Sequence, residues 1–100
     1  MTKMLVVCAG DRTSWFDRDY YATKHLALAM ECWGSYGLQA CDAFYPSSGG
    51  DGWLSIGVYR FRDEACMERA LGSAETAWVM ADVKNFTDAT MIMRSIFSPM

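Results

Sequence analysis

The chain has 100 residues, of which 52% are hydrophobic and 14% aromatic, and it carries a net charge of −3. Its acidic and basic residues are interspersed, so no basic stripe favours nucleic acid or an anionic membrane as a partner. A length of 100 residues predicts one domain, residues 1–100, and so much apolar surface in so short a chain favours an oligomer or a ligand pocket.

Alternating apolar residues predict four strands along the chain. They are predicted at residues 3–9, 38–45, 53–61 and 89–97, with a turn-rich hairpin loop at residues 46–52. The first helix is predicted from Ser14, with Asp17 completing a capping pair, to about residue 33.

Two further helices are predicted between the third and fourth strands. The first spans residues 64–71 and is capped by Asp63, and the second spans residues 74–81 and is capped by Ser73. Together they form one broken helical crossover, so the element order is βαββαβ.

This order predicts an α+β, ferredoxin-like sandwich in which the helices cover one face of a four-stranded antiparallel sheet. The first and last strands are apolar on both faces, so the second face of the sheet also requires a cover. No predicted element is left to provide it. A second copy of the chain, packed sheet to sheet in a homodimer, is therefore the predicted partner.

The apolar periodicity of the first helix predicts which side faces the core. The core-facing stripe is predicted to be Trp15, Ala22, Leu26, Ala29, Met30 and Trp33. Lys24 lies on the opposite, solvated side. A second row on one flank, Tyr21, His25, Leu28 and Cys32, is predicted to contact something other than the helix's own sheet.

The two faces of the third strand differ in character. Leu54, Ile56 and Val58 are predicted to form its covered core face. On the other face, Gly57 can leave room for a ligand or for the backbone of a partner. Trp53, Tyr59 and Phe61 on that face are predicted to wall a pocket for an aromatic substrate inside the barrel, the alternative being that they fill the dimer interface.

Two stretches of the chain resemble signatures of the EthD family, named for ethyl tert-butyl ether degradation. The first is Tyr20-Tyr21-x-Thr23-Lys24-His25-x-x-Leu28, and the second is Val79-Met80-Ala81-Asp82-Val83-x-Asn85-Phe86-Thr87-Asp88. The resemblance covers nearly the whole chain, although Ala27 and Lys84 stand where the family often has proline. It implies a dimeric α/β barrel of the bacterial cytoplasm. The wider barrel group includes cofactor-free monooxygenases, cyclases, isomerases and haem-degrading enzymes.

His25, the only histidine, is the leading catalytic candidate because an imidazole titrates near neutrality and can take up and return a proton. Tyr21 lies four residues before it on the same flank and is predicted to be its partner. A hydrogen-bond donor to a developing oxyanion could come from Tyr20, Tyr21, Tyr59 or Arg94. Tyr20 is better interpreted as packing with a hydrogen-bonded hydroxyl. The structural alternative for His25 is a hydrogen bond across the helix–sheet or dimer boundary.

Arg94 stands on an otherwise apolar strand and needs a partner if it is buried. An ion pair with Asp42 is preferred, and a substrate carboxylate bound by Arg94 is the functional alternative. Four cysteines without C-x-x-C spacing do not support a zinc site, and one histidine with no basic clamp gives little support for haem. We therefore predict no metal and no cofactor, with reduced thiols in the cytoplasm.

The sequence thus predicts a homodimer that binds a small apolar or aromatic metabolite. If it is an enzyme, it is predicted to be a cofactor-independent isomerase, cyclase or monooxygenase that uses His25 for proton transfer. The alternative is a non-catalytic binding or accessory protein of a degradation pathway, and a third hypothesis is a purely structural dimer whose cavity is filled by its own side chains.

Overall fold

The computed structural model describes residues 1–11, 13–47 and 52–98, so residues 48–51 of the predicted hairpin loop lie outside the described residues. The strands are β1 (Thr2–Ala9), β2 (Leu38–Phe44), β3 (Trp53–Phe61) and β4 (Met91–Phe97). The helices are α1 (Arg18–Tyr20), α2 (Leu26–Trp33), α3 (Glu64–Leu71) and α4 (Thr76–Ala81). A π-helical turn, η1 (Tyr21–His25), joins α1 to α2, and the 3₁₀ turns η2 (Gly34–Tyr36) and η3 (Asp82–Asn85) follow α2 and α4.

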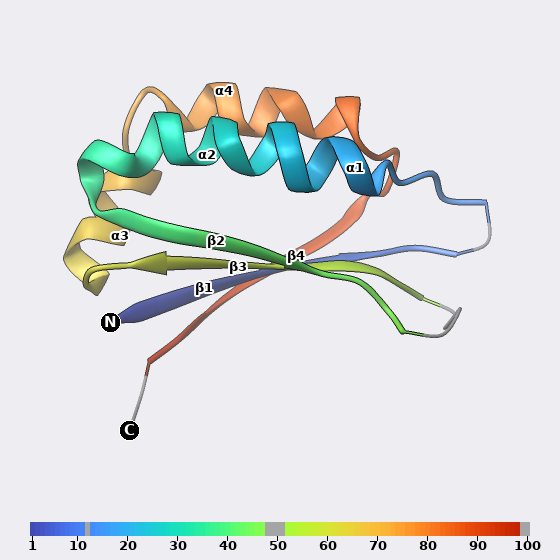
Figure 1. Ribbon diagram of the computed structural model, residues 1–100, viewed down its shortest axis with the longest axis horizontal. Coiled ribbons are helices and arrows are strands. Elements are labelled where there is room, and N and C mark those ends of the chain that lie inside the picture. The colour runs from blue at the N-terminus through green and yellow to red at the C-terminus, as the bar shows by residue number, and fades with distance from the viewer. Residues whose placement is uncertain (12, 48–51, 99–100) are drawn as a thin grey trace.

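The four strands form one antiparallel sheet in the order β2-β3-β1-β4. Helices α1, α2 and α4 run side by side over one face of this sheet, and α3 lies at its end (Figure 1). The predicted α+β, ferredoxin-like fold with a four-stranded antiparallel sheet is therefore confirmed.

The faces of β3 are the reverse of the prediction. Tyr59 and Phe61 are buried against Trp33 of α2, with ring centroids 6.0 and 6.2 Å from its ring, whereas Ile56 and Val58 lie half-buried on the open face. Tyr59 and Phe61 point toward the helices because burying their large rings removes more apolar surface from water than burying Ile56 and Val58 would. Both faces of β3 carry apolar residues in the sequence, so the alternation pattern could not show which face points toward the helices.

Gly57 does leave room beneath the helices, but the chain fills that room itself. A Cβ atom added at Gly57 would overlap the hydroxyl of Tyr21. The prediction that a ligand or a partner backbone uses this space is therefore wrong.

The first helix begins later than predicted. Asp17, not Ser14, is its N-cap, and the Asp17 carboxylate accepts a hydrogen bond from the backbone N–H of Tyr20 at 3.0 Å. The Ser14 hydroxyl instead accepts from the backbone N–H of Asp11. Trp15 consequently precedes the helix and is exposed rather than in the core.

The π-helical turn changes which residues face the sheet. Tyr21 and His25 are buried, whereas Ala22, predicted for the core stripe, is exposed. A π-helical turn accommodates one extra residue, so the core-facing position before it moves back from residue 22 to residue 21. Leu26 and Ala29, which follow the turn, are buried as the regular periodicity predicts.

The two crossover helices differ in how well their starts were predicted. Asp63 caps α3 as expected, accepting from the backbone N–H of Cys66 at 2.8 Å. Helix α4 begins at Thr76, and the hydroxyl of Ser73 does not cap it but donates to the backbone carbonyl of Ala70.

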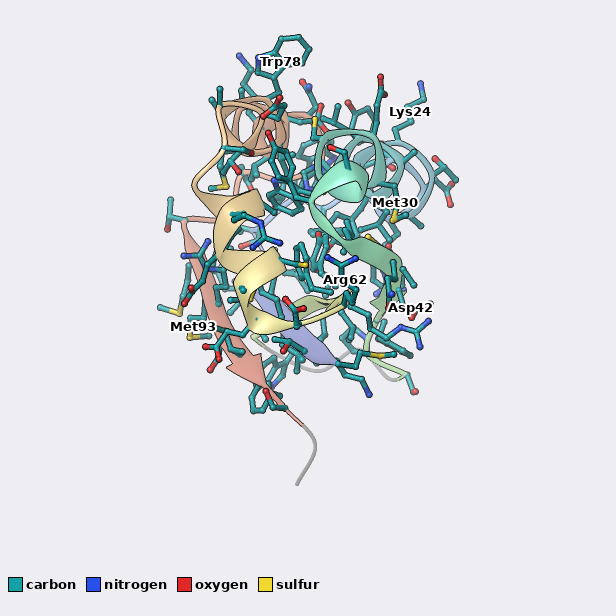
Figure 2. The ribbon with its side chains drawn as sticks, turned by 90° about the vertical axis from the view of Figure 1, so that its left-hand side faces the viewer. Lys24, Met30, Asp42, Arg62, Trp78 and Met93 are labelled. Carbon is teal, nitrogen blue, oxygen red and sulfur yellow. The ribbon has the colours of Figure 1, made fainter. Side chains whose placement is uncertain are left out.

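The middle of the sheet face opposite the helices is apolar and, within the described residues, uncovered, while Lys3, Asp42, Arg60 and Ser95 are the polar residues of this face. It carries half-buried side chains on β1 and β3 and more exposed ones on the two edge strands: Leu5, Val7, Ile56, Val58, Phe44, Met91, Met93 and Phe97. Figure 2 shows Met93 and Asp42 at opposite edges of the sheet, whereas Lys24 and Trp78 lie on the outer side of the helical layer. The predicted solvation of Lys24 agrees with its exposure.

We predict that Gly57→Ala lowers the free energy of unfolding by about 1–3 kcal/mol, because its methyl group displaces the Tyr21 hydroxyl from a filled core. Urea unfolding measures the effect. Gly34→Ala is the matched control, since Gly34 has helical φ and no heavy atom within 4 Å of an added Cβ. A Gly57→Ala protein as stable as the unsubstituted chain would contradict the packing described for Tyr21.

Candidate functional site

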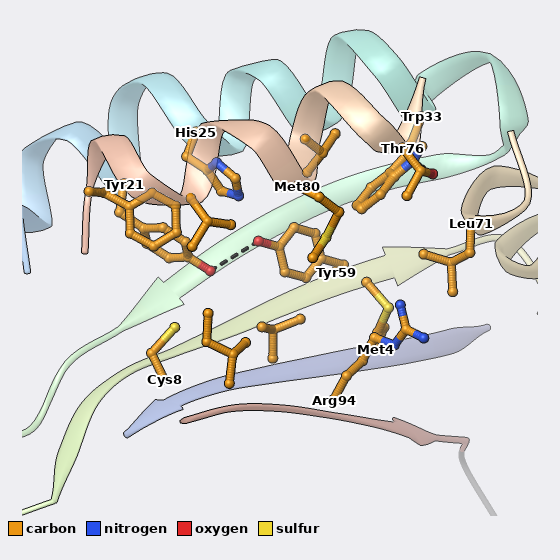
Figure 3. Close-up of a pocket in the computed structure, with 15 residues that line it drawn as sticks. Met4, Cys8, Tyr21, His25, Trp33, Tyr59, Leu71, Thr76, Met80 and Arg94 are labelled. Carbon is orange, nitrogen blue, oxygen red and sulfur yellow. Dashed lines mark hydrogen bonds between the residues drawn. The ribbon is translucent and has the colours of Figure 1, made fainter. Parts of the chain in front are cut away.

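A cavity of about 430 Å³ lies between the helical layer and the β1–β4 side of the sheet (Figure 3). Its lining residues differ in exposure. Tyr21, His25 and Tyr59 are each at most 4% exposed, whereas Met80, Ile92 and Arg94 are exposed. The cavity is therefore closed at the tyrosine and histidine end and opens between α4 and β4.

The Asp82 carboxylate, at the start of η3, holds the closed end of the cavity in place. It accepts hydrogen bonds from the Tyr20 hydroxyl at 2.6 Å, from the Asn85 amide at 2.9 Å and from Nδ1 of His25 at 2.9 Å. Burial alone would raise the pKa of Asp82, but these hydrogen bonds outweigh it and hold the pKa below its usual value. Asp82 is therefore ionised at neutral pH.

His25 is neutral at neutral pH. Its pKa lies below the usual 6.5 because burial disfavours the imidazolium more than the nearby Asp82 carboxylate favours it. The ionised Asp82 carboxylate can only accept a hydrogen bond, so Nδ1 of His25 carries the ring proton and Nε2 keeps its lone pair. Among the described residues, no group hydrogen-bonds Nε2, and the ring lines the cavity. The arrangement is that of an oriented, neutral imidazole with one free lone pair, which is what a general base requires.

Aromatic rings fix the orientation of the imidazole. The His25 ring stacks on Tyr21, with ring centroids 5.4 Å apart and an interplanar angle of 17°. Phe86 packs against the same imidazole with a centroid distance of 4.6 Å. The ring is therefore held by contacts on its faces and by Asp82 at Nδ1, which restricts its rotation.

The hydroxyls of Tyr21 and Tyr59 share one hydrogen bond of 3.0 Å at the cavity wall. Burial raises the pKa of both phenols, so both remain protonated at neutral pH. Two O–H groups bring two hydrogens, and their mutual bond uses one. Since no other hydrogen bond to either hydroxyl occurs within the described part of the chain, the second hydrogen is available to an oxygen atom of a ligand.

The two signature stretches lie against each other in the fold. Besides the Asp82 bonds, the backbone N–H of Asp17 donates to the carbonyl of Phe86 at 2.7 Å, and Asp88 accepts from the backbone N–H of Trp15. The second stretch thus anchors the entry to the first helix. Two motifs that are far apart in sequence therefore build one site.

The structure brings only some of the predicted site residues together. His25, Tyr21, Tyr59 and Arg94 all line the cavity, whereas Trp53 lies outside it, over half exposed near the hairpin end of the sheet. Trp53 therefore does not line this cavity of the single chain, and its place in a pocket of the dimeric barrel stays a prediction. The physical reason is that Trp53 stands at the first residue of β3, beyond the part of the sheet that the helices cover.

The preferred ion pair between Arg94 and Asp42 does not form. Arg94 is on β4 and Asp42 on β2, the two edge strands of the sheet, and Asp42 pairs with Val58 on the open face. Arg94 pairs with Val6 and faces the helical side. No ion pair of Arg94 is formed within residues 1–11, 13–47 and 52–98.

Sequence reasoning missed Asp82 as a site residue, although it lies in the second signature stretch. Its signal was an acidic residue between the apolar residues 79–81 and Val83, which becomes informative only when the fold brings it to His25. Tyr20 has the predicted structural role, with its hydroxyl bonded to the same carboxylate. In the residues that the structure describes, no group of three or more His, Cys, Asp or Glu side chains is placed to hold a metal ion.

Comparison with solved structures identifies the fold. An EthD-like protein from Ralstonia eutropha JMP134 superposes with a TM-score of 0.77 at 17% identity, over 94% of this chain and 88% of that one. An ethyl tert-butyl ether degradation (EthD) family protein from Bacillus halodurans C-125 gives a TM-score of 0.70 at 16% identity, over 100% and 99%. The chain has the fold of EthD-like proteins. The resemblance predicted from the two signatures is thus confirmed at the level of the fold.

A DABB family protein with a ferredoxin-like fold, from Mesorhizobium loti MAFF303099, is also similar, with a TM-score of 0.62 at 11% identity over 99% of this chain and 97% of that one. No protein-family model and no curated protein matches the sequence. No helix among the described residues is long and apolar enough to cross a membrane. At these identities the likeness establishes the fold and leaves the activity to the chemistry of the site.

We predict that the pKa of His25 lies below 6.5 and falls further in Asp82→Asn, because the Asp82 carboxylate raises it by hydrogen bond and charge. His25 is the only histidine, so its ring C–H signals report the titration directly by NMR. Asp19→Asn, an exposed acid on the same helical segment, should leave the pKa unchanged. A pKa that rises in Asp82→Asn would show that Asp82 does not hold the imidazole as described.

Proposed function

We propose that the chain binds a small, largely apolar or aromatic metabolite in the cavity and transfers a proton on it, with His25 as the base. One observation carries the proposal: an imidazole nitrogen without a proton faces an apolar cavity beside an unused phenol O–H. A neutral base and an oxyanion donor are what proton abstraction next to a carbonyl requires.

The proposed step uses only this chain's residues. Nε2 of His25 takes a proton from a carbon next to a carbonyl. The electron pair of the broken C–H bond forms a C=C bond to the carbonyl carbon, and the π pair of the carbonyl moves to its oxygen. The Tyr21–Tyr59 pair donates its free O–H to that oxygen, and Asp82 stabilises the imidazolium. Return of the proton from Nε2 to another carbon of the same molecule completes an isomerisation. In a cyclisation, the enolate carbon instead bonds to a second carbonyl carbon of that molecule, the π electrons of that carbonyl move to its oxygen, and the imidazolium returns its proton to the resulting alkoxide.

The compartment proposed for this reaction is the cytoplasm. All four cysteines are free thiols, and Cys8, Cys32 and Cys66 are buried. Packed thiols of this kind persist in a reducing compartment.

We further propose that two chains pack through the open sheet face and form the dimeric α/β barrel that the family resemblance implies. The support is the continuous apolar surface of β1, β3 and β4 opposite the helices, with Met93 and Phe97 about half exposed on it. A face of this kind is costly to leave in water and matches itself under a two-fold axis.

The assembly is tested by light scattering at micromolar concentration, which should give the mass of two chains. Ile56→Lys places a charge in the middle of the open face and should give monomers. Trp78→Lys removes a large apolar side chain that is 70% exposed on the helical side and should leave the dimer intact. A monomeric unsubstituted chain, or a monomer caused equally by Trp78→Lys, would contradict packing through the sheet.

The reaction is tested by incorporation of solvent deuterium next to the carbonyl in a panel of aromatic and alicyclic ketones and lactones, followed by NMR. His25→Asn should lower the exchange rate of any accepted compound by about 100-fold or more. Glu31→Gln, an exposed change on α2, should leave the rate unchanged. Exchange that survives in His25→Asn rules out His25 as the base. Binding without exchange favours a non-catalytic binding protein, and oxygen consumption with a substrate favours a monooxygenase.

A further inference from the structure

The polar groups that line the cavity fall into two sets. In the first set, the Thr76 hydroxyl accepts from Trp33 Nε1 at 2.9 Å and donates to the carbonyl of Ala70 at 2.7 Å, so both residues are already satisfied. The second set has capacity left: the Arg94 guanidinium, Nε2 of His25 and one phenol hydrogen of the tyrosine pair. These three groups define what a ligand must offer.

The three groups lie at different depths. The base and the phenol stand at the closed end, where the side chains are at most 4% exposed, and Arg94 stands on edge strand β4 at the exposed mouth. In Figure 3 the Arg94 guanidinium points from the sheet into the cavity beside Met4, whereas His25 enters from the helical layer at the other end of the view. The wall between them is apolar, with Met4, Val6 and Ile92 on its floor.

Arg94 is the only side chain with a permanent charge among the described lining residues, and none of those lining residues is an acid. A guanidinium presents paired N–H donors that fit a carboxylate, and a single cation balances a single negative charge. Arg94 has no acidic partner among the described residues, and it stands at the mouth of an apolar cavity. Such a cation selects for an anion on an otherwise apolar molecule.

We propose that the ligand of this cavity is an apolar or aromatic carboxylate, whose carboxylate group binds Arg94 at the mouth while its opposite end reaches His25 and the tyrosine pair. This inference rests on the proposed function and adds the substrate class and its direction in the site. Arg94 acts as a binding residue that sets which end of the substrate meets the base.

Matched acid and amide probes test the charge requirement. Benzoate with benzamide and 2-naphthoate with 2-naphthamide differ in charge but hardly in shape. Isothermal titration calorimetry gives the affinities, and the NMR signals of His25 show whether a probe occupies the cavity. At least one acid should bind about ten-fold more tightly than its amide, as expected for a charge-assisted hydrogen bond to a partly exposed arginine.

Variants assign that preference to Arg94. In Arg94→Met the acid and the amide should bind equally, and Arg94→Lys should restore part of the difference, because a lysine keeps the charge without the planar fork. Lys24→Met removes one positive charge from the solvated side of the helical layer and should keep the preference. Because Arg94 is exposed, its substitutions should leave the thermal unfolding temperature of the protein nearly unchanged. Differences in affinity then report on binding and not on folding.

The outcomes separate this inference from the proposed function. The acid and the amide could bind the unsubstituted chain with equal affinity while both shift the His25 signals. This result would overturn the carboxylate inference and leave proton transfer by His25 standing. A preference for the acid that persists in Arg94→Met would also overturn it, since another group would then bind the anion. If no probe shifts the His25 signals, the inference fails, whereas deuterium exchange on neutral ketones would still support His25 as the base.

Discussion

The organisation of the site depends on the Asp82 carboxylate and the three hydrogen bonds that it accepts. One carboxylate joins the η3 turn to Tyr20 in α1 and to His25 at the end of η1, so it links the two helical segments above the sheet. The same bond to Nδ1 decides which imidazole nitrogen faces the cavity. The contact that joins the two helical segments is therefore also the contact that determines the chemistry of His25.

Burial produces opposite charge states on the two sides of this contact. Asp82 stays ionised because three donors compensate its desolvation, whereas His25 has one carboxylate partner and stays neutral. The tyrosine pair is desolvated further and keeps both protons. At the closed end of the cavity, a neutral imidazole thus lies beside neutral phenol groups, and the permanent charge of Arg94 lies at the mouth. The proposed proton transfer to His25 requires this separation, because a cation next to the imidazole would weaken it as a base at neutral pH.

The fold could be predicted from the sequence because strand alternation, the Asp63 cap and the βαββαβ order are local signals that agree with one another. The predicted core stripe included Ala22 because it assumed a regular helix, and the π-helical turn over residues 21–25 moved Tyr21 and His25 into the core instead. The role of Asp82 could not be read from the sequence, because it lies 57 residues from His25 and its effect requires tertiary contact. Arg94 and Asp42 looked like complementary charges, but the strand order places them at opposite edges of the sheet.

The most direct measurement is a two-bond ¹H–¹⁵N correlation spectrum of the His25 imidazole at neutral pH. We expect one tautomer, with the proton on Nδ1 and an unprotonated Nε2 facing the cavity. This assignment is free of overlap because the chain contains a single histidine. A proton found on Nε2, or on both nitrogens, would contradict the account, because His25 would then be a hydrogen-bond donor or a cation and could not take up a proton from a ligand.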